Sequence, residues 1–267
     1  MNKIPIVTLL SDFGLRDPYV AEMKAVILSI SPDACIVDIS HEIEEFNIRM
    51  GAFILASATP YFPQGTVHVA VVDPGVGTKR HPIIIQTERS FYVGPDNGLL
   101  LLSALKEEVS HVYHIKNPKY MRPKISTTFH GRDIFAPAAA YLSMGCAPSR
   151  FGPEIEDYFV PQFAKPYVKE GELIGEAMYV DGFGNVVTNI SLKDLEKLET
   201  SMGDLLRVRI KRKTFDMRFC PAYGDVPVRT PLVIVGSHDF LEISINQGDA
   251  SKGLNLKVGD TLGMYFC

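Results

Sequence analysis

The chain has 267 residues, a length at which one hydrophobic core tends to split into two domains, and its formal net charge is −4. Because it has no block of lysine and arginine, the charge pattern argues against nucleic acid or an anionic membrane surface as a partner. Its apolar runs are too short to span a membrane and its first residues do not resemble a signal peptide, so we expect a cytoplasmic protein.

Short apolar runs alternate with helical patterns over the first half, which is typical of an α/β layer fold with a mostly parallel sheet. The expected strands are 4–10, 34–40, 66–72, 81–88, 90–96 and 111–116. The expected helices are 17–31, 47–61, 98–108 and 132–145. In the first helix Asp17 suits the N-cap and Pro18 suits the first helical position.

Proline, glycine and acidic residues from 148 to 169 indicate a linker. Beyond it the pattern becomes a two-residue alternation interrupted by glycine, which is typical of a small antiparallel barrel or sandwich. These runs are 171–191, 205–220, 231–246 and 260–267, with one short helix expected at 191–200. We therefore predict a three-layer α/β domain over 1–160 and a small, barrel-like β domain over 170–267.

Polar residues directly follow several apolar runs of the first half. Ligands of parallel α/β sheets bind beyond the carboxyl ends of the strands, so we expect Asp12, Asp73 and Asn97 on one rim. Asp12 could accept two ribose hydroxyls, although an ordinary turn acid explains it equally well. The glycines near Asp73 match no phosphate-binding loop pattern, and a tight turn with positive φ at Asn97 and Gly98 explains that pair without a ligand.

His130 lies just before a predicted helix, where backbone N–H groups favour a neutral imidazole that can accept a proton. Arg132 and Asp133 follow it, and we interpret them as helix-start charges that pair at the surface. In the second half Asp181, Phe183 and Asn185 share one loop. That loop suits either an ordinary hairpin or the recognition of a purine and an ammonium group.

Asn246 and the cysteines give weaker indications of function. Asn246 ends a late strand, where a turn is a sufficient explanation. The four cysteines are widely scattered, with no pair and no histidine in metal-ligand spacing. We therefore expect reduced thiols and no metal site.

Six stretches, in order over nearly the whole chain, together resemble one enzyme family. They are LLSDFGLRDPYV, VVDPGVGTKR, VGPDNGLL, TFHGRDIFAPAAAYL, VDGFGNVVTNI and EISINQGDAS. They are similar to the S-adenosyl-L-methionine (SAM) hydroxide adenosyltransferase family, relatives of the fluorinase and chlorinase. The resemblance implies hydrolysis of SAM, without a cofactor, to adenosine and L-methionine. It also implies a homotrimer with each site between the first domain of one subunit and the second domain of its neighbour.

The resemblance implies a role for each matching residue. Asp73, Arg80 and His130 match the set that holds and activates the attacking water. The implied substrate-binding residues are Asp12 at the ribose, Phe46 beside the nucleoside, Thr128 and Phe129 at the reacting carbon, Asp181 and Asn185 at the methionine or purine, and Ser237 and Asn246 in the second domain. Asn97 and Phe183 complete the predicted substrate-binding set.

Two alternatives stay open. Halide-using relatives lack an aspartate at the position of Asp73 and a histidine at that of His130, which favours hydroxide, but halogenation at C5′ is a second hypothesis. A non-catalytic adenosine-binding module is a third, although binding alone needs neither residue. With a reference pKa of about 6.5, His130 is the preferred proton acceptor at neutral pH, leaving orientation and charge balance to Asp73 and Arg80.

Overall fold

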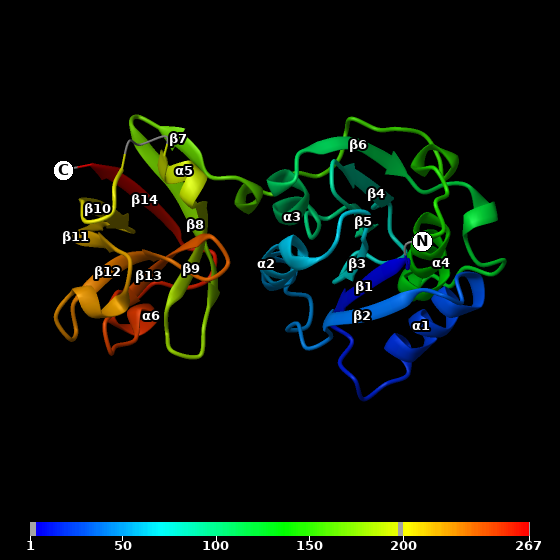
Figure 1. Ribbon diagram of the computed structural model, residues 1–267, viewed down its shortest axis with the longest axis horizontal. Coiled ribbons are helices and arrows are strands. Elements are labelled where there is room, and N and C mark those ends of the chain that lie inside the picture. The colour runs from blue at the N-terminus through cyan, green and yellow to red at the C-terminus, as the bar shows by residue number, and fades with distance from the viewer. Residues whose placement is uncertain (1–3, 197–199, 267) are drawn as a thin grey trace. The chain divides into compact units, whose positions relative to one another are not determined.

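A computed structural model describes residues 4–196 and 200–266, which form two compact units that divide between Pro161 and Gln162. The first unit contains a sheet with the strand order β2-β1-β3-β5-β4-β6 (Figure 1). Strands β2, β1, β3 and β5 are parallel, and β4 runs antiparallel to β5 and β6. The strands are β1 (Ile6–Ser11), β2 (Cys35–Ser40), β3 (Val67–Val71), β4 (Pro82–Thr87), β5 (Phe91–Pro95) and β6 (Val109–His114).

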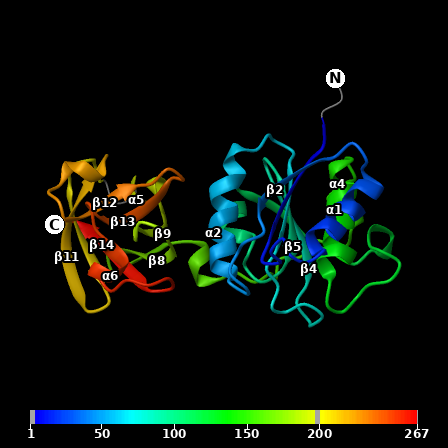
Figure 2. The same ribbon diagram turned by 90° about the horizontal axis from the view of Figure 1, so that it is seen from below.

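Helices cover both faces of this sheet, as Figure 2 shows for α1 (Tyr19–Ile30) and α4 (Ala136–Ser143) on one side and α2 (Ile48–Ala58) on the other. Helix α3 (Leu101–Lys106) packs against α2. On the α1 and α4 side, apolar residues of alternate strand positions, such as Val7 and Leu9, pack against Met23 and Ile27 of α1. The predicted three-layer α/β architecture is therefore confirmed.

Two helix starts differ from the sequence prediction. Pro18, not Asp17, is the N-cap of α1, and its carbonyl accepts the first helical hydrogen bond, from Glu22 N–H at 2.9 Å. The helix predicted at 132–145 begins instead with a π-helical turn, Gly131–Phe135, that continues into α4. Pro137 is the second residue of α4 and has no N–H, and the carbonyl of Asp133, four residues earlier, accepts from Arg122 N–H instead.

The second unit is a β-barrel that closes where β14 pairs with β8. Leu206, Phe219 and Leu241 are among the buried side chains that fill it. Its pairs are antiparallel except for β11 and β12, which are parallel because residues 221–230 carry the chain back before β12 begins. The strands are β7 (Tyr167–Lys169), β8 (Glu172–Val180), β9 (Val186–Ser191), β10 (Leu205–Ile210), β11 (Lys213–Cys220), β12 (Pro231–Val235), β13 (Phe240–Ile245) and β14 (Thr261–Phe266).

Short helical segments complete the second unit. Helix α5 (Leu192–Glu196) begins the helix predicted at 191–200, of which residues 197–199 lie outside the described residues. Helix α6 (Ala250–Gly253) was not predicted. The predicted linker at 148–169 contains β7 at its end, so the barrel begins earlier than the composition indicates.

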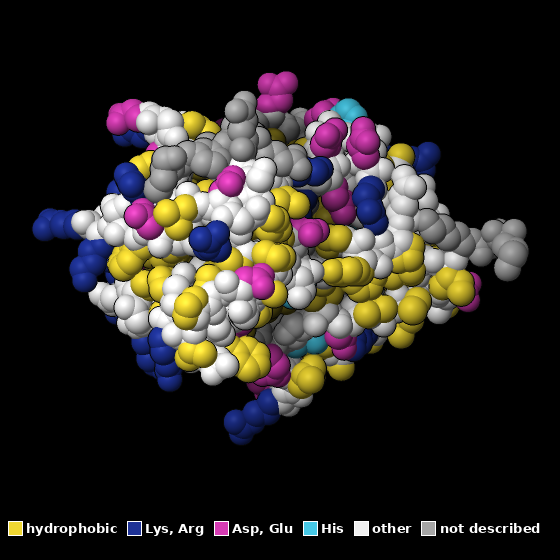
Figure 3. All heavy atoms as spheres, turned by 60° about the vertical axis from the view of Figure 1, so that its left-hand side comes forward, with side chains coloured by type: hydrophobic (Ala, Val, Ile, Leu, Met, Phe, Trp, Pro, Cys, Tyr) yellow, Lys and Arg dark blue, Asp and Glu magenta, His cyan; other side chains and the backbone are white. Residues whose placement is uncertain are grey.

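The surface carries charged side chains of both signs scattered among patches of hydrophobic side chains, on the face drawn in Figure 3. Among the large exposed hydrophobic residues are Phe46 and Phe183, with exposed fractions of 66% and 82%. In residues 4–196 and 200–266, no helix combines the length and the apolar composition that a bilayer crossing requires.

Candidate active site

The carboxyl ends of β1, β3 and β5 meet at one edge of the sheet because these neighbouring strands are parallel. Asp12 directly follows β1, Asp73 comes two residues after the end of β3, and Asn97 comes two residues after the end of β5. This is the edge at which open α/β sheets bind their ligands. The topology therefore delivers acidic and amide side chains from several loops to one place.

Arg80 joins Asp73 to His130 at this edge. Its Nε donates to Asp73 Oδ1 at 3.0 Å, and its Nη2 donates to Asp73 Oδ2. The same Nη2 lies 2.8 Å from Nδ1 of His130. The side chains of Arg80 and Asp73 are only 9% and 5% exposed, so this charged pair is largely shielded from water. Two side chains, those of Asp73 and His130, thus share the guanidinium of Arg80.

The contact with Arg80 identifies the tautomer of His130. A guanidinium has no acceptor, so Nδ1 of His130 must accept the hydrogen bond, and the neutral ring then carries its proton on Nε2. Burial lowers the pKa of His130 and the charge of Arg80 lowers it further, while Asp73 and Asp133 oppose this shift. The net pKa lies below the ordinary 6.5, which keeps the imidazole neutral at pH 7.

The turn that bears Asp73 and Arg80 packs directly against the loop before His130. Gly77 has φ +74°, and a Cβ there would lie 2.4 Å from the carbonyl oxygen of Thr127. The next residue, Thr128, is exposed and its N–H donates to Ser126 Oγ at 3.2 Å. Phe129 is buried, with its ring centroid 5.2 Å from that of Tyr19. The two loops therefore need close backbone contact to form the Arg80–His130 hydrogen bond.

Asp12 lies against the segment that carries Phe46. The N–H of Phe46 donates to Asp12 Oδ2 at 2.9 Å, and Phe46 itself has a left-handed φ of 62°. Burial raises the pKa of Asp12, which the Phe46 N–H partly offsets. The structure thus brings an acceptor carboxylate and an exposed aromatic ring together.

Asn97 already has partners at both ends of its amide. Its Nδ2 donates to the carbonyl of Val72 at 2.8 Å, and its Oδ1 accepts from Leu99 N–H at 3.1 Å. These bonds fasten the end of β3 to the turn after β5. The expectation of a positive φ at both turn residues is wrong, because Gly98 alone of the two has one, at +93°.

In the second unit, Asp181 organises the loop between β8 and β9. Its Oδ1 accepts from the N–H groups of Phe183 and Asn185, both at 2.9 Å, and its Oδ2 accepts from Asn185 Nδ2 at 2.9 Å. Asn185 is buried, whereas Phe183 extends into solvent. The loop therefore holds its own acid and amide together and presents one aromatic ring.

The structure does not bring Ser237 and Asn246 together. They lie at opposite ends of β13, a strand whose six residues span roughly 20 Å. Ser237 is exposed in the turn before β13. Asn246 follows that strand, and its Nδ2 donates to the carbonyl of Val226 at 2.8 Å.

Sequence reasoning missed a buried acid in the barrel. Glu242 on β13 is 8% exposed and accepts a hydrogen bond from the Tyr223 hydroxyl at 2.9 Å. Burial raises the pKa of Glu242, and the charge of Asp181 adds to this, whereas Tyr223 and His238 oppose it. The available signal was an acidic residue inside the apolar run Phe240–Ile245.

Over the part of the chain that the structure describes, no group of three His, Cys, Asp or Glu side chains is arranged to hold a metal ion. Cys35, Cys146 and Cys220 are free thiols, and Cys267 lies outside the described residues.

Comparisons with known proteins cover both units. Residues 7–152 match the model of the SAM hydroxide adenosyltransferase N-terminal domain, and residues 175–263 match that of its C-terminal domain. The (R)-S-adenosyl-L-methionine hydrolase of Thermus thermophilus is 38% identical, over 95% of this chain and 96% of its own length. The fluorinase of an Actinoplanes species is 28% identical, over 98% of this chain and 97% of its own length. An uncharacterized conserved protein from Thermotoga maritima, known from a crystal structure, is 43% identical in sequence. The match covers 97% of this chain and 99% of that chain, with a TM-score of 0.83.

Proposed function

Since this chain belongs to the SAM hydroxide adenosyltransferase family, we propose that it hydrolyses SAM to adenosine and L-methionine with water held by Asp73, Arg80 and His130. The relatives named as SAM hydrolases are more similar to it, at 36% to 38% identity, than the fluorinases at 26% to 28%. The observation that carries the proposal is the contact of one guanidinium with both Asp73 and His130.

The reaction is an in-line displacement at C5′ of the adenosyl group. A bond forms between the water oxygen and C5′ while the bond from C5′ to sulfur breaks, and the sulfur takes the electron pair to become the neutral thioether of methionine. Because a sulfonium leaves without protonation, the protein needs to align the water and remove one proton from it.

The tautomer of His130 indicates which residue aligns the water and which removes its proton. With Nδ1 occupied by Arg80, the Nε2–H of His130 is a donor that orients the water oxygen. The carboxylate of Asp73 keeps lone pairs beyond those that Arg80 uses, so it takes the proton in this proposal. This assignment reverses the preference drawn from the sequence, where a neutral histidine was the expected acceptor.

The remaining residues bind the substrate in this proposal. Asp12 accepts the ribose hydroxyls, and Phe46 packs beside the nucleoside. Thr128 and Phe129 line the path to C5′. The second unit contributes the other predicted contacts, which are Asp181, Phe183, Asn185, Ser237 and Asn246.

The proposal includes the assembly and the location of the protein. We infer a cytoplasmic homotrimer in which the second unit of a neighbouring subunit completes each site. The support is the resemblance to the family, which extends over residues 7–152 and 175–263.

The products distinguish the proposed reaction from its alternatives. Incubation with SAM in the presence and absence of excess chloride, followed by chromatography, is expected to yield adenosine and L-methionine in both cases. Formation of 5′-chloro-5′-deoxyadenosine would instead identify a halogenase. Tight adenosine binding without turnover of SAM would identify a binding module.

A further inference from the structure

The carboxylate of Asp133 is completely buried, with an exposed fraction of 0%. The sequence interpretation of Arg132 and Asp133 as surface charges is therefore wrong for the aspartate. A buried carboxylate is costly unless hydrogen bonds and an opposite charge compensate it. Its partners indicate why this position holds an acid.

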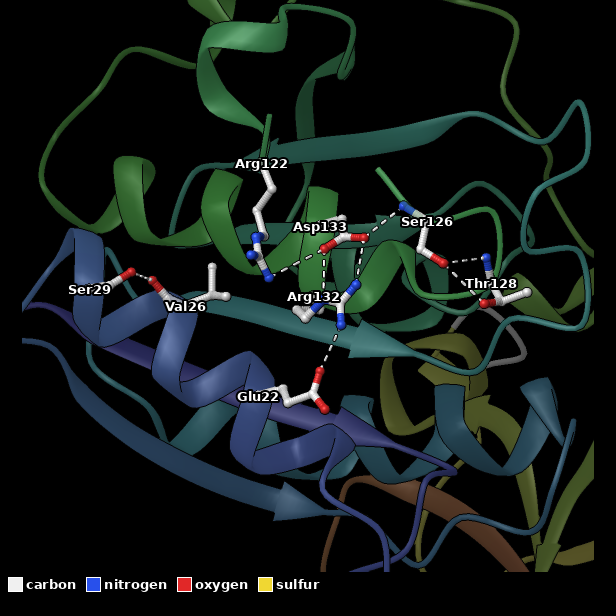
Figure 4. Close-up of polar contacts among 8 residues, drawn as sticks. All are labelled: Glu22, Val26, Ser29, Arg122, Ser126, Thr128, Arg132 and Asp133. Carbon is white, nitrogen blue, oxygen red and sulfur yellow. Dashed lines mark hydrogen bonds and ion pairs between the residues drawn. The ribbon is translucent and has the colours of Figure 1, made fainter. Parts of the chain in front are cut away.

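Asp133 fastens the loop before His130 at several points, of which Figure 4 shows the contact with Ser126. Its Oδ2 accepts from the backbone N–H of Ser126 at 2.8 Å. Its own carbonyl accepts from Arg122 N–H at 2.9 Å, and its N–H donates to the carbonyl of Phe129 at 3.2 Å. One residue thus ties the beginning, the middle and the end of the segment 122–129, which leads directly into His130.

Arg132 supplies the positive charge that the buried acid requires. Its Nε lies 2.7 Å from Asp133 Oδ1 and its Nη2 lies 3.0 Å from Oδ2, while its Nη1 reaches Glu22 of α1 at 2.8 Å. Its guanidinium also lies 5.0 Å from the ring centroid of Phe129. Although burial raises the pKa of Asp133, the hydrogen bonds from Arg132 and Ser126, together with the charges of Arg132 and Arg122, outweigh it, so the pKa lies below its ordinary value.

The backbone at this point is a π-helical turn. The N–H of Ala136 bonds to the carbonyl of Gly131, five residues earlier. Such turns are frequent at functional sites because one extra residue in the helix redirects the side chains beside it. Here the turn immediately follows His130 and contains Asp133.

We propose that Asp133 is a positioning residue of the hydrolytic reaction, whose buried carboxylate holds the loop 122–130 so that Nδ1 of His130 meets Arg80. This inference rests on the proposed function. Asp133 acts through the loop, because Ser126 and Phe129 connect it to the segment that ends at His130. A displacement of His130 of about 1 Å is enough to lower the rate about 100-fold when a reaction depends on alignment.

The charge of Asp133 also reaches His130. The charged groups that act on the imidazole are Arg80, which lowers its pKa, and Asp73 and Asp133, which raise it. Removing the charge at position 133 lowers the pKa of His130, whereas loss of the Arg80 contact raises it. The hydrogen bond at Nδ1 of His130 and the kcat of the folded variant are therefore the readouts that separate positioning from a purely structural role.

The decisive variant is Asp133→Asn, with Glu22→Gln as its control. The asparagine keeps the size of the side chain but loses the charge and one acceptor for Arg132. We expect kcat to fall about 10- to 100-fold with KM changed less than about threefold, and the Nδ1 signal of His130, followed by NMR of its imidazole, to report a weaker hydrogen bond to Arg80. Glu22→Gln removes only the outer partner of Arg132 and is expected to stay within about twofold of wild type.

Folding is checked by circular dichroism and the melting temperature. If Asp133→Asn does not fold, Arg132→Gln is the second variant. It removes the charged hydrogen-bond partner of the Asp133 carboxylate but leaves the contact with Ser126, and a smaller loss of kcat is expected. A folded Asp133→Asn protein with wild-type kcat would overturn the inference, whatever the pKa of His130. Failure of the wild-type protein to release adenosine would overturn the proposed function instead, and the Nδ1 signal of His130 would still show whether Asp133 holds the ring against Arg80.

Discussion

Gly77 lies where the two loops of the candidate site are in backbone contact. Its φ of +74° is unfavourable for any residue with a Cβ, and a Cβ would lie 2.4 Å from the carbonyl oxygen of Thr127. The spacing of glycines after Asp73 indicates a turn in the sequence, but the contact with Thr127 joins residues 50 positions apart and has no local signal.

Substitution Gly77→Ala is expected to lower both stability and activity. The left-handed conformation alone costs roughly 1–2 kcal/mol, and the clash with Thr127 moves the loop that carries His130. Gly145→Ala is the matched control, because Gly145 has φ +87° but nothing within 4 Å of its Cβ position. Denaturant unfolding and kcat should both change more for Gly77→Ala, and equal losses in the two variants would contradict the importance of the loop contact.

Substitutions distinguish the proposed role of Asp73 from that of His130. We expect Asp73→Asn to lower kcat by about 10²–10⁴-fold, the usual effect of losing a general base. His130→Gln should cost less, because an amide N–H can still donate to the water. Near-normal turnover of Asp73→Asn with a large loss in His130→Gln would make the histidine the acceptor and refute the tautomer argument.

The pH dependence of kcat follows from the environment of His130. Burial and then Arg80 lower its pKa below 6.5, and a protonated ring could not accept from Arg80. The neutral form that this site requires is therefore present at pH 6.5 and disappears only at lower pH. A pH profile that already falls by half at 6.5 or above would contradict this environment.

At the scale of elements, strand and helix periodicity predicts much of this fold. Alternating and fully apolar runs indicate the strands of both units, and Asn47 caps α2 as its residue type suggests, by accepting from Met50 N–H. The π-helical turn Gly131–Phe135 has no such signal, because its apolar spacing is also compatible with an α-helix. The parallel pairing of β11 and β12 depends on the path of residues 221–230, which periodicity does not describe.

The pairing of β1 with β3 buries a histidine, and this makes the first unit sensitive to acid. His68 has an exposed fraction of 0%, its Nδ1 lies 2.8 Å from Thr8 Oγ1, and burial lowers its pKa from 6.5 to about 3. Between these values the unfolded chain binds a proton that the folded chain does not, so stability falls as the pH falls from 6.5 towards 3.

The expected slope from His68 is at most about 1.4 kcal/mol per pH unit. His68→Gln should flatten the dependence of unfolding free energy on pH in this range. Chemical denaturation of wild type and His68→Gln at several pH values measures this. The same slope in wild type and His68→Gln would show that this histidine does not titrate as its burial requires.

At the scale of the whole molecule, the motifs predict the family and the chemistry better than they predict the contacts. The resemblance drawn from six stretches is confirmed by the family matches over residues 7–152 and 175–263. The roles of individual site residues stay predictions, because they depend on a ligand and on neighbouring subunits. Asp133 was misjudged for a related reason. Its neighbour Arg132 is only one of its partners, and the contacts with Ser126 and, through Arg132, with Glu22 have no local signal in the sequence.

The proposed assembly gives a prediction of its own. Light scattering during size-exclusion chromatography should report three subunits of 29.6 kDa each. If the second unit of a neighbour completes the site, mixing Asp73→Asn subunits with Phe183→Ala subunits should restore some activity, because some sites then draw both intact parts from different chains. A fully active monomer would contradict the shared site.

The most direct test of the central claim is the fate of the water oxygen. When SAM is hydrolysed in ¹⁸O-labelled water, attack at C5′ places the label in the 5′-hydroxyl of adenosine and none in L-methionine. Mass spectrometry of both products measures this. Unlabelled adenosine, or label in the methionine carboxylate alone, would contradict displacement at C5′ by a water molecule.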